Sequence, residues 1–170
     1  MNNIDDYKIG INSDLLQLAS FEENRVLATY MVQQATRTLD IASRLLDPPI
    51  FNSPEFIEAV RSFVTKNSKA KVRIIVHDPA TIVKLGHRLV NLASHLSSLI
   101  EIRKAGNEHK YYSECLLVAD DTAFLHRLNG ERFEATANFN DRRQSKYYLD
   151  GFNAMWDASV SDPNLRRMIL

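Results

Sequence analysis

The segment from Val72 to Val76 constrains the fold more than any other, because it is a nearly continuous run of Val and Ile. A strand without alternating polar residues is typical of a sheet that helices cover on both faces. Before this strand, Ser53 and Pro54 supply a hydroxyl for a helix N-cap and a proline for the first helical position. After it, Asp78 precedes another proline in the same way. The sequence therefore predicts a buried strand between two helices.

Hydrophobic periodicity places further helices and strands around this unit. Helices are predicted at residues 22–36, from residue 53 onward, at about 80–97 and at about 142–159, and strands at residues 38–43, 72–76, 99–103, 112–119, 122–127 and 133–137. This order predicts an α/β fold in which a mixed β-sheet is flanked by helices on both faces. Residues 1–20 are predicted to form an N-terminal arm or an edge strand, and residues 21–170 the α/β domain.

The composition narrows the environment of the protein. The 170 residues include 21 Lys plus Arg and 21 Asp plus Glu, so the formal net charge is zero and no overall field attracts nucleic acid or an anionic membrane. The single cysteine, Cys115, cannot form an internal disulfide, which favours a reducing compartment. The sequence shows neither a secretory signal nor the run of about 18 apolar residues that a spanning helix needs. We therefore expect a cytoplasmic protein with no membrane span.

Charge is uneven along the chain, although the total is zero. Residues 61–110 contain ten basic and three acidic residues. This excess is the one indication of an anionic partner in the composition. Basic side chains scattered over helix surfaces are the simpler explanation.

Three pieces of the sequence occur in an order that resembles a known family. They are residues 39–44 followed by the predicted helix from residue 53 and by residues 72–78; residues 113–120; and residues 137–140 before the last helix. Together they resemble one repeat of the phospholipase D-like superfamily, across roughly residues 21–160. The resemblance implies a strand that carries His-x-Lys-x-x-x-x-Asp, a hairpin after it, and a Gly-Ser-x-Asn stretch before the last helix. It also implies a homodimer, because family members with a single repeat generally pair about a twofold axis.

The catalytic pair of that family is missing here. With Asp120 aligned to the family's aspartate, Ser113 stands at the histidine position and Cys115 at the lysine position. The resemblance implies that the histidine attacks phosphorus, while the lysine and an asparagine, here Asn138, neutralise phosphate oxygens. Ser113 without an adjacent base is a poor nucleophile, and Cys115 is a small hydrophobe instead of a cation. Ser113, Cys115, Asp120 and Asn138 are therefore degenerate motif positions, and we expect phosphodiesterase activity of the family type to be lost.

Histidines elsewhere offer substitute groups. His77 follows the buried strand, at the edge where open α/β sheets bind ligands, although a hydrogen bond to loop backbone is the simpler explanation. His87 and Arg88 follow Gly86 in the middle of a predicted helix, where glycine costs about 1 kcal/mol relative to alanine. This glycine marks either a close helix crossing or a backbone gap beside an anion that His87 and Arg88 hold.

Arginines provide further candidates. Arg127 closes the predicted hairpin, and the resemblance implies that it lies near Ser113 and Asn138, where it could supply the positive charge that Cys115 does not. Arg44 follows the strand at residues 38–43 and belongs to the same set by its charge. Four polar residues also recur at helical spacing, as on a solvated helix face: Lys84, Arg88, Asn91 and His95.

These observations support two main hypotheses of function. The first is a catalytically degenerate phospholipase D-like domain that binds a partner protein or a phosphate-bearing ligand, and its candidate ligand-binding residues are Arg44, His77, His87, Arg88 and Arg127. The second is a divergent phosphodiesterase or nuclease that uses His77 or His87 with Arg88. A nucleic-acid-binding module without chemistry is a third hypothesis, supported by the basic segment 61–110. We expect no metal and no cofactor, because neither metal-ligand spacing nor a Gly-rich phosphate loop is present in the sequence.

Overall fold

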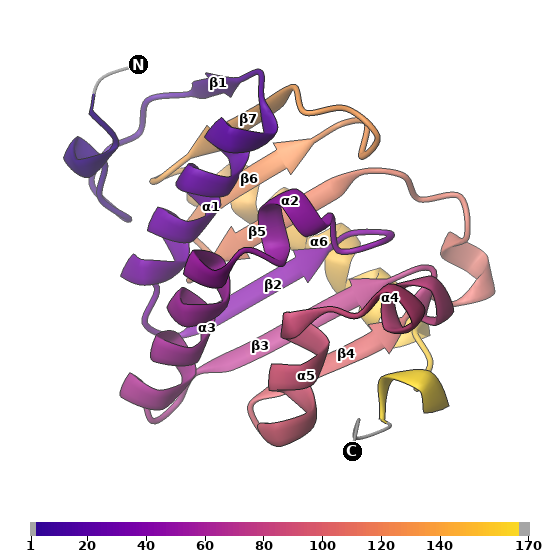
Figure 1. Ribbon diagram of the computed structural model, residues 1–170. Coiled ribbons are helices and arrows are strands. Elements are labelled where there is room, and N and C mark those ends of the chain that lie inside the picture. Colours follow the sequence, from indigo (N-terminus) through magenta and orange to yellow (C-terminus); the bar gives the residue numbers. More distant parts are fainter. Residues whose placement is uncertain (1–2, 167–170) are drawn as a thin grey trace.

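One mixed β-sheet organises the chain (Figure 1). The computed structural model describes residues 3–166, so residues 1–2 of the predicted arm and residues 167–170 of the predicted domain lie outside the described residues. The seven strands of this part are β1 (Leu16–Leu18), β2 (Thr38–Ala42), β3 (Lys71–Val76), β4 (Ile100–Lys104), β5 (Cys115–Ala119), β6 (Ala123–Arg127) and β7 (Ala135–Asn138). Their order in the sheet is β1-β7-β6-β5-β2-β3-β4. Strands β2, β3 and β4 are parallel, while the other neighbours pair antiparallel, which confirms a mixed sheet.

Helices cover both faces of the sheet, as predicted. They are α1 (Phe21–Gln34), α2 (Pro48–Phe51), α3 (Pro54–Lys66), α4 (Pro79–Leu85), α5 (Arg88–His95) and α6 (Arg142–Ala158), with short 3-10 turns at Ile4–Asp6, Asn107–His109 and Pro163–Leu165. Figure 1 shows α1, α2, α3 and α5 on one side of the sheet and α6 on the other. Each side has its own hydrophobic core. Leu27, Met31 and Val60 pack in the larger core, and Phe152 and Met155 of α6 pack in the smaller one.

The predicted helix at residues 80–97 is wrong, because the chain forms two helices there. Gly86 has φ +80°, a backbone conformation that ends α4 and that residues with side chains rarely adopt. His87 is then extended and serves as the N-cap of α5, where its Nδ1 accepts a hydrogen bond from the Leu89 N–H at 3.1 Å. The break separates Lys84 from Arg88, Asn91 and His95, so the four residues do not form one continuous helix face.

The hairpin between β5 and β6 turns through Asp120 and Asp121. Both residues have positive φ, 54° and 55°, as the tight turns that match the twist of a hairpin require. The register pairs Ala119 with Ala123 and Cys115 with Arg127. The turn therefore lies at one end of these strands, and the open end of the hairpin lies at the other.

The N-terminal arm is attached to the sheet and to α1. Strand β1 is the edge strand next to β7, and Leu16 pairs with Ala137. Before β1, the Gly10 N–H donates to the Phe139 carbonyl at 2.9 Å. The Tyr7 ring stacks on the Phe139 ring, with centroids 5.8 Å apart.

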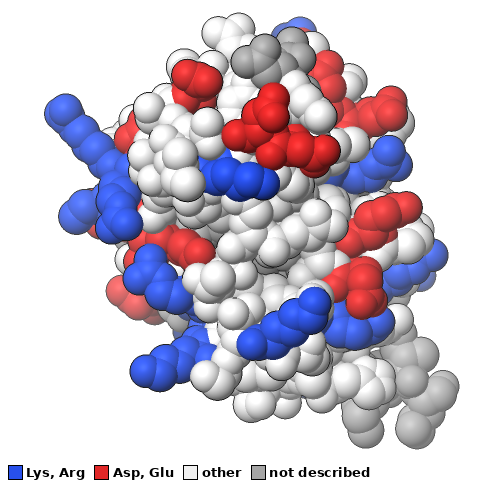
Figure 2. All heavy atoms as spheres, turned by 90° about the vertical axis from the view of Figure 1, so that its left-hand side faces the viewer, with Lys and Arg blue, Asp and Glu red and all other residues white. Residues whose placement is uncertain are grey.

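The surface carries charges of both signs. On the face shown in Figure 2, Lys and Arg side chains are interspersed with Asp and Glu, and uncharged surface separates them. Within the described residues, no helix combines the length and the apolar content that crossing a bilayer requires.

Candidate functional site

A crevice of about 750 Å³ lies at the edge of the sheet where β2 ends and β5 begins. Its lining comes from four segments: Ser43, Arg44, Leu45 and Asp47 after β2; Lys110, Tyr111, Ser113, Glu114 and Cys115 before and at the start of β5; Asn129, Gly130 and Glu131 after β6; and Phe133 before β7. The carboxyl ends of parallel β2, β3 and β4 lie at this edge, which is where open α/β sheets place ligands. The crevice is therefore the first candidate for a binding site.

A buried arginine stands behind the wall of this crevice. Arg127 lies at the end of β6, with its side chain only 1% exposed, and its Nη2 donates to Oδ2 of Asp47. Its guanidinium carbon lies 5.4 Å from the centre of the Phe133 ring. Since Asp47 and Phe133 both line the crevice, the guanidinium adjoins the cavity.

Two nitrogens of this guanidinium have no partner. Nε and Nη1 of Arg127 are buried, and neither has a hydrogen-bond partner among the described residues. Buried polar groups are nearly always hydrogen-bonded, and a buried cation left partly unpaired is costly. Arg127 is not among the residues that line the crevice, so these two donors lie behind the wall that Asp47 and Phe133 form.

Cys115 lies beside this arginine but has little reactivity of its own. Burial raises the pKa of its thiol to about 11, although the neighbouring Arg127 acts in the opposite direction. A thiol with such a pKa is almost wholly protonated at neutral pH, and the thiolate is the nucleophile. Cys115 therefore packs in the core, as expected for a hydrophobe, and Arg127 on the neighbouring strand provides the cation.

Ser113 is exposed at the mouth of the crevice. It lies before β5, which begins at Cys115, so the predicted strand at residues 112–119 starts too early. The Ser113 carbonyl accepts a hydrogen bond from the Gly130 N–H at 2.7 Å. A Cβ at position 130 would stand 2.7 Å from the same carbonyl oxygen, so the approach requires glycine. No histidine is among the described residues that line the crevice.

The other two motif positions, Asp120 and Asn138, lie at the opposite end of the strands from the crevice. Asn138 pairs with Phe124 near the hairpin turn, whereas Arg127 pairs with Cys115 at the open end. The prediction that Arg127 and Ser113 lie near Asn138 is therefore wrong for Asn138. The Asn138 Nδ2 donates to the Ser13 carbonyl at 3.1 Å, and its Oδ1 accepts from the Asn140 N–H at 2.9 Å.

Asp120 has a structural role in the turn. Its carboxylate accepts backbone N–H groups from three consecutive residues between α1 and β2: Thr36 at 2.9 Å, Arg37 at 2.7 Å and Thr38 at 3.1 Å. This arrangement ties the hairpin turn to the start of β2. It places the carboxylate far from Ser113 and Cys115, at the turn end of β5.

The two candidate histidines are held by backbone groups. His87 is buried, its Nε2 donates to the Leu46 carbonyl at 2.8 Å, and its Nδ1 accepts from Leu89, so both ring nitrogens are engaged. Burial lowers the pKa of His87, which keeps the ring neutral. His77 bonds to the His109 carbonyl at 3.0 Å and stacks on Tyr112, and burial lowers its pKa as well.

The remaining arginines separate into two places. Arg44 lines the crevice, and its Nη1 donates to the carbonyls of Lys110 and Tyr112 at 3.1 and 2.7 Å. Arg88 lies elsewhere, at the start of α5, and donates to the Asn52 carbonyl at 2.6 Å. The five predicted ligand-binding residues therefore do not form one site: only Arg44 lines the crevice, and Arg127 lies behind its wall.

Asp47 and Asn129 line the crevice, although neither is a predicted site residue. Asp47 lies directly before two prolines, Pro48 and Pro49. The structure makes Asp47 the N-cap position of the short helix α2 and the acid partner of Arg127. Arg127 at the end of a mostly apolar hairpin was the one signal in the sequence for an acid partner elsewhere in the chain.

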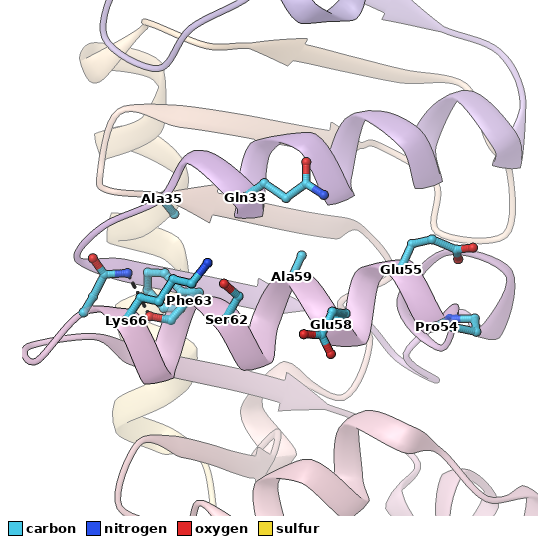
Figure 3. Close-up of a pocket in the computed structure, with 10 residues that line it drawn as sticks. Gln33, Ala35, Pro54, Glu55, Glu58, Ala59, Ser62, Phe63 and Lys66 are labelled. Carbon is cyan, nitrogen blue, oxygen red and sulfur yellow. Dashed lines mark hydrogen bonds between the residues drawn. The ribbon is translucent and has the colours of Figure 1, made fainter.

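A second hollow, of about 720 Å³, lies between α1 and α3 (Figure 3). Small side chains on α3, Ala59 and Ser62, leave room beside Gln33 of α1. Glu55, Glu58 and Lys66 also belong to its lining. Its charged groups are solvated and of both signs, so we assign it no function.

Comparisons with known proteins agree with this architecture. A family model described as "Domain of unknown function (DUF7931)" matches residues 20–168. No curated protein matches the sequence.

Among solved structures, Nuc from Salmonella typhimurium, described as a phospholipase D family member, is similar with a TM-score of 0.61 and 15% identity, over 86% of this chain and 96% of that chain. NucT from Helicobacter pylori is similar with a TM-score of 0.62 and 14% identity, over 88% and 98%. TrmBL2, described as an archaeal chromatin protein with a novel mode of DNA binding, has a TM-score of 0.64 and 14% identity over 88% of this chain. The present chain covers only 53% of TrmBL2. At these identities the likeness shows a shared fold.

Proposed function

The chain belongs to the family described as a domain of unknown function (DUF7931) and has a phospholipase D-like fold, and we propose that it binds a phosphate-bearing ligand without hydrolysing it. The observation that carries this proposal is the buried guanidinium of Arg127, which has two unpartnered nitrogens and lies behind the crevice wall formed by Asp47 and Phe133. The ligand class is an anion small enough to enter a cavity of about 750 Å³.

In the proposed phosphate site, the positive charge belongs to Arg127 of β6 and not to a residue of β5. Cys115 occupies the motif position of a lysine, and Arg127 is its direct partner in the neighbouring strand. A guanidinium donates charge-assisted hydrogen bonds to phosphate oxygens, so Nε and Nη1 of Arg127 can each serve one acceptor oxygen. Arg44 and Lys110 add positive charge at the mouth of the crevice.

The absence of suitable nucleophiles supports binding without chemistry. No histidine is among the described lining residues, and no hydrogen bond among the described residues joins the Ser113 hydroxyl to a carboxylate of that lining. The raised pKa of Cys115 keeps its thiol protonated. His87, the alternative catalytic residue, has both ring nitrogens bonded to backbone.

Nucleic acid is a less suitable ligand for this crevice. Three acidic residues, Asp47, Glu114 and Glu131, are part of its lining and would oppose a polyanion. DNA, which TrmBL2 is described as binding, is therefore the alternative ligand.

Binding is tested by titrating the protein with inorganic phosphate and with phenyl phosphate in a calorimeter. The double variant Asp47→Asn, Arg127→Met removes the cation and its acid together, so no buried charge is left unpaired. We expect it to weaken phosphate binding at least about tenfold, whereas Cys115→Ala, which keeps Arg127, binds as the wild type does. Circular dichroism verifies that both variants are folded. Failure of the wild type to bind either compound, or equal binding by the double variant, would disprove the proposal.

Catalysis is tested separately with bis-p-nitrophenyl phosphate and with single- and double-stranded DNA. We expect no turnover of any of the three substrates. Turnover that His77→Ala or His87→Ala abolishes would instead establish the divergent phosphodiesterase.

The rim of the crevice favours contact with another protein surface. Tyr111, Leu128 and Leu45 are large apolar residues on three different loops at this edge, and their exposed fractions are 84%, 76% and 44%. Exposed apolar groups that gather at one place are typical of an interaction surface. We infer that a second copy of the chain covers this rim. Size-exclusion chromatography with light scattering measures the oligomeric state of the wild type and of the double variant Tyr111→Ser, Leu128→Ser. A monomeric wild type, or a double variant that is still a dimer, would contradict the inference.

A further inference from the structure

A groove of about 540 Å³ separates α3 from α5, away from the crevice. Its lining consists of Ile57, Arg61 and Thr65 from α3, and of Arg88, Asn91, Leu92, His95 and Leu96 from α5 and its end. The three α3 residues recur every four positions, so they form one stripe along that helix. The groove therefore lies between two facing helix stripes.

The charge of this groove distinguishes it from the other cavities. Its lining includes two arginines and a histidine but no acidic residue. Acidic side chains are part of the lining of each of the other four cavities described for the chain. All of its lining residues except Ile57 belong to the basic segment 61–110, and two of the basic residues of that segment, Arg61 and Arg88, line the groove.

The basic side chains are partly fixed in position. Arg88 is anchored to the loop before α3, because its Nη1 and its backbone N–H both bond to Asn52, at 2.6 and 2.8 Å. Arg61 lies on the opposite wall and forms an exposed ion pair with Glu58 at 3.2 Å. The partner of Arg88 is a neutral amide and carbonyl, so its charge is available to an anion.

The floor of the groove is apolar. Ile57 and Leu92 are buried side chains that reach the groove from opposite helices, and Leu96 is partly buried beside them. Apolar surface between two cations does not assist contact with a phosphate backbone, which is bound by charge alone. It does favour a segment that presents an apolar side chain between carboxylates.

We propose that the groove between α3 and α5 binds an acidic peptide segment of a partner protein, with one apolar side chain on Ile57 and Leu92 and carboxylates on Arg61 and Arg88. The site is independent of the crevice, because the two share no lining residue. Neither interaction depends on the other.

The test uses fluorescence anisotropy with a fluorescein-labelled peptide, Gly-Ser-Glu-Asp-Leu-Glu-Glu-Ser-Gly. We expect saturable binding that weakens as salt is raised. A second peptide with Ser in place of Leu should bind more weakly, because it lacks the apolar contact. A labelled DNA duplex of mixed sequence should not bind in the groove.

Two variants probe the groove, and each has a matched control on α6. Asn91→Asp places a carboxylate in the groove without changing the shape of the side chain, and we expect binding about tenfold weaker. Arg61→Glu should weaken binding more. Asn153→Asp and Lys146→Glu make the same charge changes at exposed positions of α6, and we expect them to bind as the wild type does.

Three results would overturn the proposal. They are no binding of the acidic peptide by the wild type, equal loss in the groove variants and the α6 controls, and DNA binding that Asn91→Asp and Arg61→Glu abolish. The last would identify the groove as a nucleic-acid contact. Because Asn91→Asp leaves the contacts of Arg88 with Asn52 intact, the test does not depend on a variant that disturbs the fold.

Discussion

Arg127 lies directly opposite Cys115 in the sheet, so the positive charge at this edge of the molecule belongs to β6, and the position where a lysine would be expected is part of the core. A cation therefore lies close to the position that resembles the family's lysine, but on the neighbouring strand. Its anchor is Asp47, which comes from a third segment of the chain. The pair therefore joins β6 to the loop after β2.

We expect Asp47→Ala to destabilise the protein by about 3–5 kcal/mol, because it leaves Arg127 buried without its acid. Chemical denaturation measures this change. The matched control is Arg132→Ala, which breaks an ion pair with Glu134 that is exposed on both sides and should cost less than about 1 kcal/mol. Equal losses of unfolding free energy for the two substitutions would show that the buried pair stabilises the protein no more than the exposed one.

Asp120 and Asp121 should respond in opposite ways to the same substitution. Asp120→Gly relieves a positive φ but removes the acceptor of three backbone N–H groups, so we expect a loss of about 2–3 kcal/mol. Asp121→Gly relieves the same kind of strain at an exposed position, and we expect it to be neutral or to stabilise by up to about 1 kcal/mol. Thermal unfolding of both variants checks the pair, and a stabilised Asp120→Gly protein would refute the structural role.

Gly86 and Gly151 form a second matched pair. A Cβ would meet no atom within 4 Å at either position, so crowding does not distinguish them. Gly86 has φ +80°, and we expect Gly86→Ala to cost about 1–2 kcal/mol. Gly151 lies within α6, where alanine should stabilise by up to about 1 kcal/mol. Denaturant midpoints compare the two variants, and a Gly86→Ala protein as stable as the wild type would contradict this account of the helix break.

The stability of the protein should fall as the pH is lowered below about 6.5. Burial lowers the pKa of His87 and of His77 from the ordinary value of 6.5, so the unfolded chain binds protons that the folded chain does not. The stabilising contribution is complete above 6.5 and declines below it until the pKa of the folded state is reached. Urea unfolding at a series of pH values measures this.

His87→Asn provides the control for that pH dependence. Asparagine can still accept the Leu89 N–H as an N-cap, but it does not titrate. We expect a smaller change in unfolding free energy between pH 7 and pH 5 than in the wild type, with the remainder due to His77. An unchanged slope would show that His87 is not the group that titrates.

Cys115 should react slowly with iodoacetamide in the native protein at neutral pH. Burial limits access to the thiol, and a pKa of about 11 leaves little thiolate. Urea-unfolded protein should react rapidly under the same conditions. Mass spectrometry follows the modification, and rapid alkylation of the native protein would contradict the assignment of Cys115 to the core.

Local patterns were sufficient to predict most of the fold. The Val and Ile run of β3 and the hydroxyl of Ser53 before a proline depend only on neighbouring residues, and both predicted elements are confirmed. The break at Gly86 was missed because apolar residues on either side, such as Ile82 and Leu89, continue the helical period. Periodicity does not report the sign of φ at a glycine.

The candidate site was harder to predict, because its parts are distant in sequence. Asp47 and Arg127 are 80 positions apart, and no local pattern links them. Ser113 and Asn138 follow the order of the family motifs, yet an antiparallel hairpin places them at opposite edges of the sheet. The register of the strands, which motif spacing does not show, decides which side chains meet.

The pairing of β1 with β7 has a consequence for how the chain is made. Leu16 and Ala137 are neighbours in the sheet although nearly the whole domain separates them in sequence. During synthesis β1 leaves the ribosome early and has no partner until β7 has emerged, so its backbone groups stay in water for most of translation. Contacts of such long range close slowly. The sheet can therefore be completed at this edge only after β7 has emerged.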